Sequence, residues 1–173
     1  MDIRITWKTR TKDILPYLNE DNIQSLLDAV PEYPLEKDLL SMKINEFAEI
    51  LSDENAFVAE LTRHRRALVA FGRMKSYKRQ MEEFAKMVKK YDFQRRPEET
   101  AAAKGIMFPN LAQRMLSDCV RFFHLKSFDE AENMTLSDWL AVFIEDASNT
   151  LFERRVSDAY DKKSKMRQKG GKP

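Results

Sequence analysis

The sequence predicts an all-α protein, a helical bundle of about six to eight helices with one short N-terminal strand or extended arm. Apolar residues recur at helical spacing over most of the 173 residues. The chain contains only four glycines and six prolines, which disfavours an all-β fold with its many tight turns. Apolar and polar side chains alternate cleanly only near the N-terminus. These three observations point to helix-on-helix packing.

The exception is the N-terminal stretch DIRITWK, in which Ile3, Ile5 and Trp7 alternate with polar residues as they do in a strand. A lone buried strand leaves its backbone N–H and C=O groups unpaired at a cost in free energy. Its partner would be the segment GIMF at 105–108 or another chain. The alternative is an extended arm that pairs with nothing.

Two helical stretches should follow, over residues 12–29 and 35–51. The first carries leucines and isoleucines at helical spacing, with an interruption near 19–21. Pro31 and Pro34 separate the two stretches, because proline disfavours helical geometry in the residue before it. Ser52 or Asp53 is suited to cap the helix that comes next.

Two apolar stripes with 4-3-4-3 spacing cover residues 57–91, most of which belong to the long basic segment of residues 61–96. The stripes are Phe57, Leu61, His64, Leu68 and Phe71, then Tyr77, Met81, Phe84, Val88 and Tyr91. Between Phe71 and Tyr77 the interval is six residues rather than seven, so the stripes are out of phase. Gly72 lies in that interval and has poor helix propensity. We therefore expect a bend, or two helices, near residues 72–75.

The remaining helices have recognisable ends. Pro97 followed by two glutamates predicts a helix start, and Gly105 its stop. A strongly apolar helix should cover 110–124, and Ser127 with Glu130, then Thr135 with Asp138, form candidate capping boxes. A long final helix begins at Leu136, with an apolar face that continues thinly to Val156 and Tyr160 and then a basic tail. QRRPEE is the best candidate boundary, giving an N-terminal helical subdomain (1–96) and a C-terminal one (97–173).

The net charge of +2 conceals blocks of opposite sign. Residues 11–62 sum to −9 and residues 63–96 to +9, and such blocks can attract one another within a chain or between subunits. The basic side chains opposite the Tyr77–Tyr91 stripe are Lys75, Arg79, Lys86 and Lys90. They form either a solvated face, in which Glu82 and Glu83 pair with Lys86 and Arg79, or a surface that meets an acidic partner.

Chemistry-bearing motifs are not apparent in the sequence. Neither phosphate-binding glycine pattern occurs, and two histidines sixty residues apart with one cysteine make a poor zinc site. Cys119 and His124 would diverge by about 140° on a helix, so they do not suggest a nucleophile pair. We expect a protein that is not an enzyme, with no catalytic residue, cofactor, metal or small-molecule substrate.

The cellular setting is predicted from absences. A single cysteine fits a reducing compartment, and the N-terminus lacks the apolar run of a signal peptide. No stretch approaches the ~20 apolar residues of a membrane span. The expected location is cytoplasmic.

Three stretches resemble small helical virion-assembly proteins of tailed phages, the tail assembly chaperones in particular. They are the extended start IRITW, the acidic leucine-rich region ending LLSMKINEFAEIL, and the late helix LSDWLAVFIEDASNTLFERRVSDAYDKK, which leads into a basic tail. The resemblance implies a protein that holds a tape-measure or tail subunit before assembly, in the host cytoplasm or the virion.

Two functions follow as hypotheses. The first is a non-enzymatic assembly factor or adaptor that acts through helix–helix contacts with a protein partner or a second copy. It would also donate its N-terminal strand, so that Ile3, Ile5 and Trp7 fill alternate pockets. The alternative is a nucleic-acid-associated protein without sequence specificity, which uses the basic face of residues 63–96 and the tail KKSKMRQKGGK to neutralise phosphates.

Overall fold

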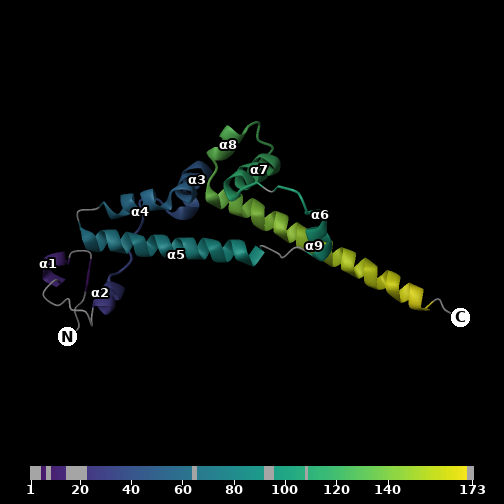
Figure 1. Ribbon diagram of the computed structural model, residues 1–173, viewed down its shortest axis with the longest axis horizontal. Helices are drawn as coiled ribbons and strands as arrows, with labels where there is room; N and C mark the ends of the chain where they lie inside the picture. Colours follow the sequence, from purple (N-terminus) through teal and green to yellow (C-terminus); the bar gives the residue numbers. More distant parts are fainter. Residues whose placement is uncertain are drawn as a thin grey trace.

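Two long helices, α5 (Ala67–Tyr91) and α9 (Leu136–Gly170), organise the chain in this computed structural model (Figure 1). The structure describes residues 5–6, 9–14, 23–63, 66–91, 96–107 and 109–170. The shorter elements of these residues are α1 (Thr11–Ile14), α2 (Ile23–Ala29), the 3-10 helix η2 (Leu39–Ser41), α3 (Ile44–Ser52), α4 (Glu54–Thr62), α6 (Pro97–Ala102), α7 (Leu111–Phe123) and α8 (Phe128–Glu132). The predicted all-α class is confirmed. The described residues form nine α-helices, one more than the upper end of the predicted six to eight. Two of the nine, α1 and α8, are single turns of four and five residues.

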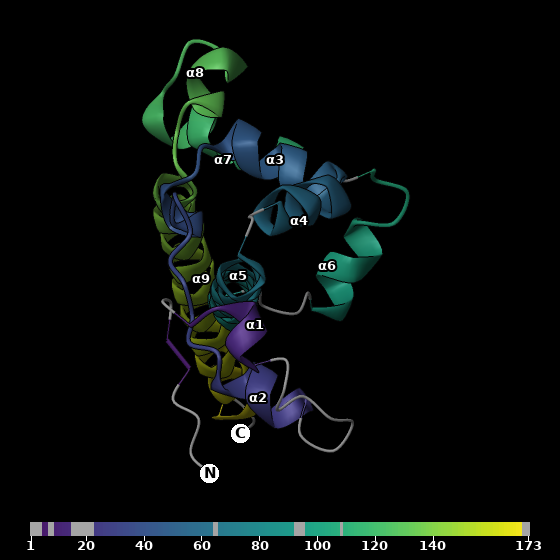
Figure 2. The ribbon, with the colours of Figure 1, turned by 90° about the vertical axis from the view of Figure 1, so that its left-hand side faces the viewer.

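Helix α5 lies between other helices on two opposite sides. Helix α4 lies along one side of α5, and α1 and α2 lie on the other, as the two views agree (Figures 1 and 2). Helix α7 packs on the first part of α9, and α8 packs on α7 and α3. Beyond α6, α9 continues away from the rest of the molecule toward the C-terminus (Figure 1).

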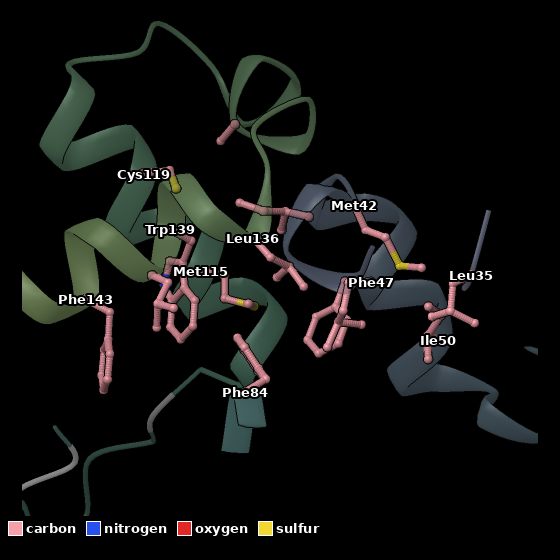
Figure 3. Close-up of a cluster of buried hydrophobic side chains, with 14 of the residues drawn as sticks. Leu35, Met42, Phe47, Ile50, Phe84, Met115, Cys119, Leu136, Trp139 and Phe143 are labelled. Carbon is pink, nitrogen blue, oxygen red and sulfur yellow. The ribbon is translucent and has the colours of Figure 1, made fainter. Parts of the chain in front are cut away.

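The main core is aromatic at its centre, and its buried residues come from α3, α5, α7, α8 and α9 and from the segment around η2 (Figure 3). The Phe84 ring of α5 lies 5.4 Å from that of Phe47 in α3 and 6.0 Å from that of Trp139 in α9, and Trp139 stacks on Phe143 at 5.1 Å. Met115 of α7 is fully buried in the same cluster. The core therefore combines residues from both sides of the boundary predicted near residue 97. The division into two subdomains stays a prediction.

A short backbone pairing ties the starts of α3 and α9 together. Ile44 donates its N–H to the Met134 carbonyl, and Leu136 donates to the Met42 carbonyl, each at 2.9 Å. These bonds flank an antiparallel bridge between residues 43 and 135. The predicted helix over 35–51 is therefore wrong in its first half. Only the short 3-10 helix η2 precedes α3 there, and residues 42 and 43 are extended because the backbone pairs across to the segment before α9.

A smaller second core explains the phase change in α5. Ile5, Ile14 and Val30 are buried together, and Leu68 and Phe71 pack against them. Residues from Tyr77 onward on the same helix instead face the main core. The interval from Phe71 to Tyr77 is one residue shorter than the seven-residue repeat. One residue corresponds to about 100° around the helix, so the apolar face turns by that angle between the two cores.

The predicted break near residues 72–75 is wrong. Helix α5 runs without interruption from Ala67 to Tyr91. The two helices of this region meet earlier, where α4 ends at Thr62 and α5 begins at Ala67. Gly72 is buried within α5, and its carbonyl accepts a hydrogen bond of 3.1 Å from the Tyr33 N–H. A stripe that changes phase on one helix thus marks two cores rather than a bend.

Most predicted helix ends are confirmed. Helix α6 begins at Pro97, and Gly105 follows it with a φ of +82°. Asn110 caps α7, and Thr135 with Asp138 forms a reciprocal cap at the start of α9. At α8 the Ser127 hydroxyl accepts from the Glu130 N–H, but the Glu130 carboxylate accepts from Lys126 instead of Ser127.

No strand occurs in the described residues, where residues 105–107 join no backbone ladder. Ile3, Trp7 and residue 108 of the predicted pairing lie outside those residues, as does the predicted interruption at 19–21.

Candidate partner-binding surfaces

The basic face of α5 is partly used within the fold. Lys75 donates from Nζ to the carbonyls of Asp28 and Val30, each at 2.8 Å, and so satisfies the C-terminal end of α2. Arg79 pairs with Glu32 at 2.7 Å and with Glu83 at 3.0 Å, and both carboxylates raise the pKa of its guanidinium. The predicted Arg79–Glu83 pair is therefore confirmed. Lys75 and Arg79, two of the predicted site residues, therefore bind groups of the same chain.

The other end of that face is free. Lys86 is exposed and has no hydrogen bond or ion pair to any described residue, so the predicted pair with Glu82 does not form. Lys90 is exposed as well, and its ammonium lies 5.3 Å from the Tyr91 ring centre. The structure thus separates the four basic residues into two that hold the fold and two that face solvent.

Of the predicted strand residues, only Ile5 is described. Its side chain is 7% exposed and packs in the second core. Ile3 and Trp7 lie outside the described residues. Strand donation to a partner stays a prediction.

An acidic groove that the sequence did not reveal runs along α3 and α4. It comprises two adjoining hollows of about 450 and 430 Å³ that share Lys37, Met42, Phe57 and Glu60. Its apolar lining comes from one end of the main core, where Leu35, Met42 and Ile50 gather (Figure 3). The groove exists because residues 35–42, before α3, lie alongside α4, which is a tertiary arrangement without a local sequence signal.

The rim of the acidic groove is negative around its first hollow, whereas the second hollow is lined by Lys37, Arg63 and Arg73 as well as by Glu36 and Glu60. The first hollow is lined by the carboxylates of Glu46, Glu49, Asp53 and Glu60, against one cation, Lys37. Lys37 is already paired with Glu46 at 2.7 Å, and that hydrogen bond, followed by one from the Lys43 N–H, lowers the pKa of Glu46. The rim therefore keeps unpaired negative charge.

Two of these carboxylates are free to meet a ligand. Glu49 and Glu60 are exposed, and their side chains have no partner among the described residues. Asp53, in contrast, accepts a hydrogen bond of 3.0 Å from the Ala56 N–H and caps α4.

The last part of α9 carries a second apolar face, which we call the outer face. It is formed by Phe152 (67% exposed), Val156 (36%), Tyr160 (70%) and Met166 (73%). Phe152 follows Phe143 by nine residues, which places it about 180° around the helix from the core side. The prediction that the core face of α9 continues to Val156 and Tyr160 is therefore wrong: the helix turns these residues to the opposite side.

Helix α6 covers only the core side of this region. Arg154 pairs with Glu99 at 2.6 Å, and Arg96 pairs with Asp158 at 3.1 Å. Every side chain from Arg155 to Met166 is exposed. We call residues 152–170 the α9 arm. The 4-3 spacing of Phe152, Val156 and Ala159 was the signal from which the outer face could have been found.

Of the groups considered for chemistry, Cys119 and His124 differ in their exposure to solvent. Cys119 is fully buried, and burial, with smaller effects of Asp118 and Asp138, raises the pKa of its thiol to about 11. His124 is exposed and ends α7 in a left-handed conformation with φ of 53°, and His64 lies outside the described residues. Within the described ranges, no three His, Cys, Asp or Glu side chains are grouped as a metal ion would require.

None of the helices in the described part of the chain is both long and apolar enough to cross a lipid bilayer. Comparison with protein-family models, with curated proteins and with solved structures gives no match to this chain.

Proposed function

We propose that the protein is a non-enzymatic assembly factor or adaptor that binds a protein partner by helix–helix contact through the α9 arm. The observation that carries the proposal is the outer face. Phe152 and Tyr160 are large apolar side chains, each about two-thirds exposed, on a helix that extends away from the body (Figure 1). Amphipathic helices bind grooves through residues spaced three and four apart, and Phe152, Val156 and Tyr160 follow one another at intervals of four.

The rest of α9 supports a role in which the arm is presented rigidly. Its first turns are anchored in the main core by Leu136, Trp139 and Phe143. The same helix then runs on to Gly170, a length of about 52 Å for 35 residues. A partner gripping the outer face would therefore be held at a fixed distance from the core. The finer proposal, a tail assembly protein of a tailed phage, rests on the sequence resemblance alone.

The proposal is tested by purifying the tagged protein from its native source at near-physiological salt. We expect a stoichiometric protein companion without excess absorbance at 260 nm. The double substitution F152Q/Y160Q should remove that companion, because it makes the outer face polar and leaves the core side of α9 intact.

The matched control is I106Q/M107Q, which changes two exposed apolar side chains outside the arm. It should retain the companion. Loss of the companion with both double variants, or with neither, would contradict a contact through the outer face.

The second candidate is nucleic-acid association through the exposed lysines of α5 and the basic tail. Lys78, Lys86, Lys89 and Lys90 are exposed on α5. Phosphate neutralisation makes affinity fall steeply as salt rises. K86E/K90E should then weaken binding to a DNA duplex without unfolding the protein. Nucleic acid that co-purifies, washes away with salt and leaves no protein companion would favour this candidate over the first.

A further inference from the structure

We propose that the α9 arm of one copy docks in the acidic groove of a second copy of this chain. This inference rests on the proposed function, because it assigns the occupant of the same outer face. It concerns two surfaces that lie on different helices and that are complementary in charge and in apolar character.

The charge complementarity is pronounced. Residues 44–62, which form α3 and α4, contain five Asp or Glu and no Lys or Arg. Residues 162–172, at the end of the chain, contain six Lys or Arg and no Asp or Glu. Exposed Glu49 and Glu60 provide the unpaired negative charge, and exposed Lys162 and Lys163 provide the positive charge. Complementary charges of this kind favour encounter and set orientation.

The apolar parts also match. Met42, Ile50 and Phe57 line the groove beneath its carboxylates. The arm offers Phe152, Val156 and Tyr160 on one side of a helix, with lysines following directly. A helix laid in the groove would bury aromatic side chains against the lining and keep its basic residues at the acidic rim.

The arm of a chain is directed away from its own groove. Helices α3 and α4 lie near the start of α9, and α9 carries the arm toward the opposite end of the molecule (Figure 1). The arm is the continuation of a helix anchored in the core, so it cannot fold back without breaking α9. The contact is therefore between copies and joins two different surfaces, which gives a reciprocal pair, a ring or an open series.

Pairing between two arms is less favourable. Lys163 follows Phe152 by eleven residues and so lies only about 20° from it around the helix, within the outer face. Packing two arms face to face would desolvate this lysine against apolar side chains. In the groove the same lysine meets carboxylates.

The test uses two charge-reversal variants of the full chain and sedimentation velocity at low salt. E49K/E60K alters the groove, and K162E/K163E alters the arm. Wild type should self-associate, and each variant alone should associate at least tenfold more weakly. An equimolar mixture of the two variants should form a complex again, because the unaltered arm of the first fits the unaltered groove of the second.

The matched control is E82K/D129K, which reverses two exposed carboxylates that have no side-chain partner among the described residues and do not line the groove. It should associate as wild type does. Circular dichroism checks the fold of every variant, and K162E/K163E alters only exposed residues of the arm.

Three results would overturn the inference. Self-association that survives E49K/E60K would show that the arm does not bind in the groove. Pairing between two arms would give that result. A mixture that fails to re-associate while both variants are folded would exclude a contact between different surfaces. A wild-type protein that is monomeric at all concentrations tested would exclude the second copy as occupant. A monomeric wild-type protein can still co-purify with a different protein that F152Q/Y160Q fails to bind. The proposed function then stands, and only the docking between copies is wrong.

Discussion

Lys75 is a predicted partner-binding residue whose ammonium group the fold itself uses. It lies within 2.8 Å of two carbonyls at the end of α2 and 5.7 Å from the Phe71 ring centre. A helix end leaves carbonyls without intrahelical partners, and a cation near them is favourable. On a helical wheel this lysine is indistinguishable from Lys86, because the wheel does not show which segment packs above it.

Replacing Lys75 with methionine should destabilise the protein. K75M removes both hydrogen bonds and keeps the aliphatic stem, so we expect a loss of about 1–2 kcal/mol in the free energy of unfolding. Urea denaturation followed by circular dichroism measures it. K86M is the matched control, because Lys86 is exposed and has no partner in the part of the chain that the structure describes. It should change stability by less than about 0.5 kcal/mol. Equal effects of the two substitutions would show that the α2 contacts contribute nothing.

Cys119 should react with a thiol reagent only when the protein opens. Its side chain is fully buried, and its raised pKa keeps it protonated at neutral pH. The thiolate is the reactive form, so labelling of the native protein at pH 8 should be slow and should become rapid in denaturant. Rapid, stoichiometric labelling without denaturant would contradict the buried position.

The same shift predicts a pH dependence of stability. The folded thiol holds its proton to a pKa of about 11, above the ordinary value of 9.0. Its contribution is therefore complete below pH 9 and is lost as the pH rises through about 11. Urea titrations between pH 8 and 11 should show the free energy of unfolding falling as the pH rises. The fall should be smaller in C119A, which lacks the thiol.

At the scale of elements, α5 and α9 show the same limit of periodicity. Each is one continuous helix whose apolar residues change face partway along. In α5 the change serves two cores, and in α9 it separates a buried face from an exposed one. Spacing alone indicates that the face changes. It does not say whether the helix bends, contacts another core or meets a partner.

The start of α9 is the best place to test an element boundary. Thr135 and Asp138 exchange hydrogen bonds of 2.9 and 3.2 Å between side chain and backbone, directly beside the bridge to α3. T135A should destabilise the protein by about 1 kcal/mol, the usual cost of a lost N-cap. S148A on the same helix is the control. Among the described residues the Ser148 hydroxyl bonds only to the Ile144 carbonyl, so stability should stay within about 0.5 kcal/mol. A T135A variant as stable as wild type would show that the bridge alone is sufficient to begin α9.

At the scale of the whole molecule, the question is whether the two predicted subdomains unfold together. The aromatic centre joins Phe47 and Phe84 from one side of residue 97 to Trp139 and Phe143 from the other. Lys43 also reaches across, donating to the Asn133 side chain at 2.7 Å. Shared burial of this kind couples the two parts.

We therefore expect a single cooperative unfolding transition. Trp139 fluorescence in a W7F background and far-ultraviolet circular dichroism should give the same urea midpoint. F84A should shift that midpoint in both signals by an equal amount, because Phe84 contacts both halves of the core. Two separate transitions would instead show that residues 1–96 and 97–173 unfold independently.

The sequence by itself determined the all-α class, the helix starts at Pro97 and Leu136, and the basic and acidic blocks. These properties depend on local spacing, on proline geometry and on side chains that bond to their own backbone a few residues away. Only the tertiary structure decided that α5 is unbroken, that Lys75 and Arg79 are held within the fold, and that an acidic groove lies along α3 and α4. Those features depend on which segments meet across long sequence separations, and neither helical period nor charge count contains that information.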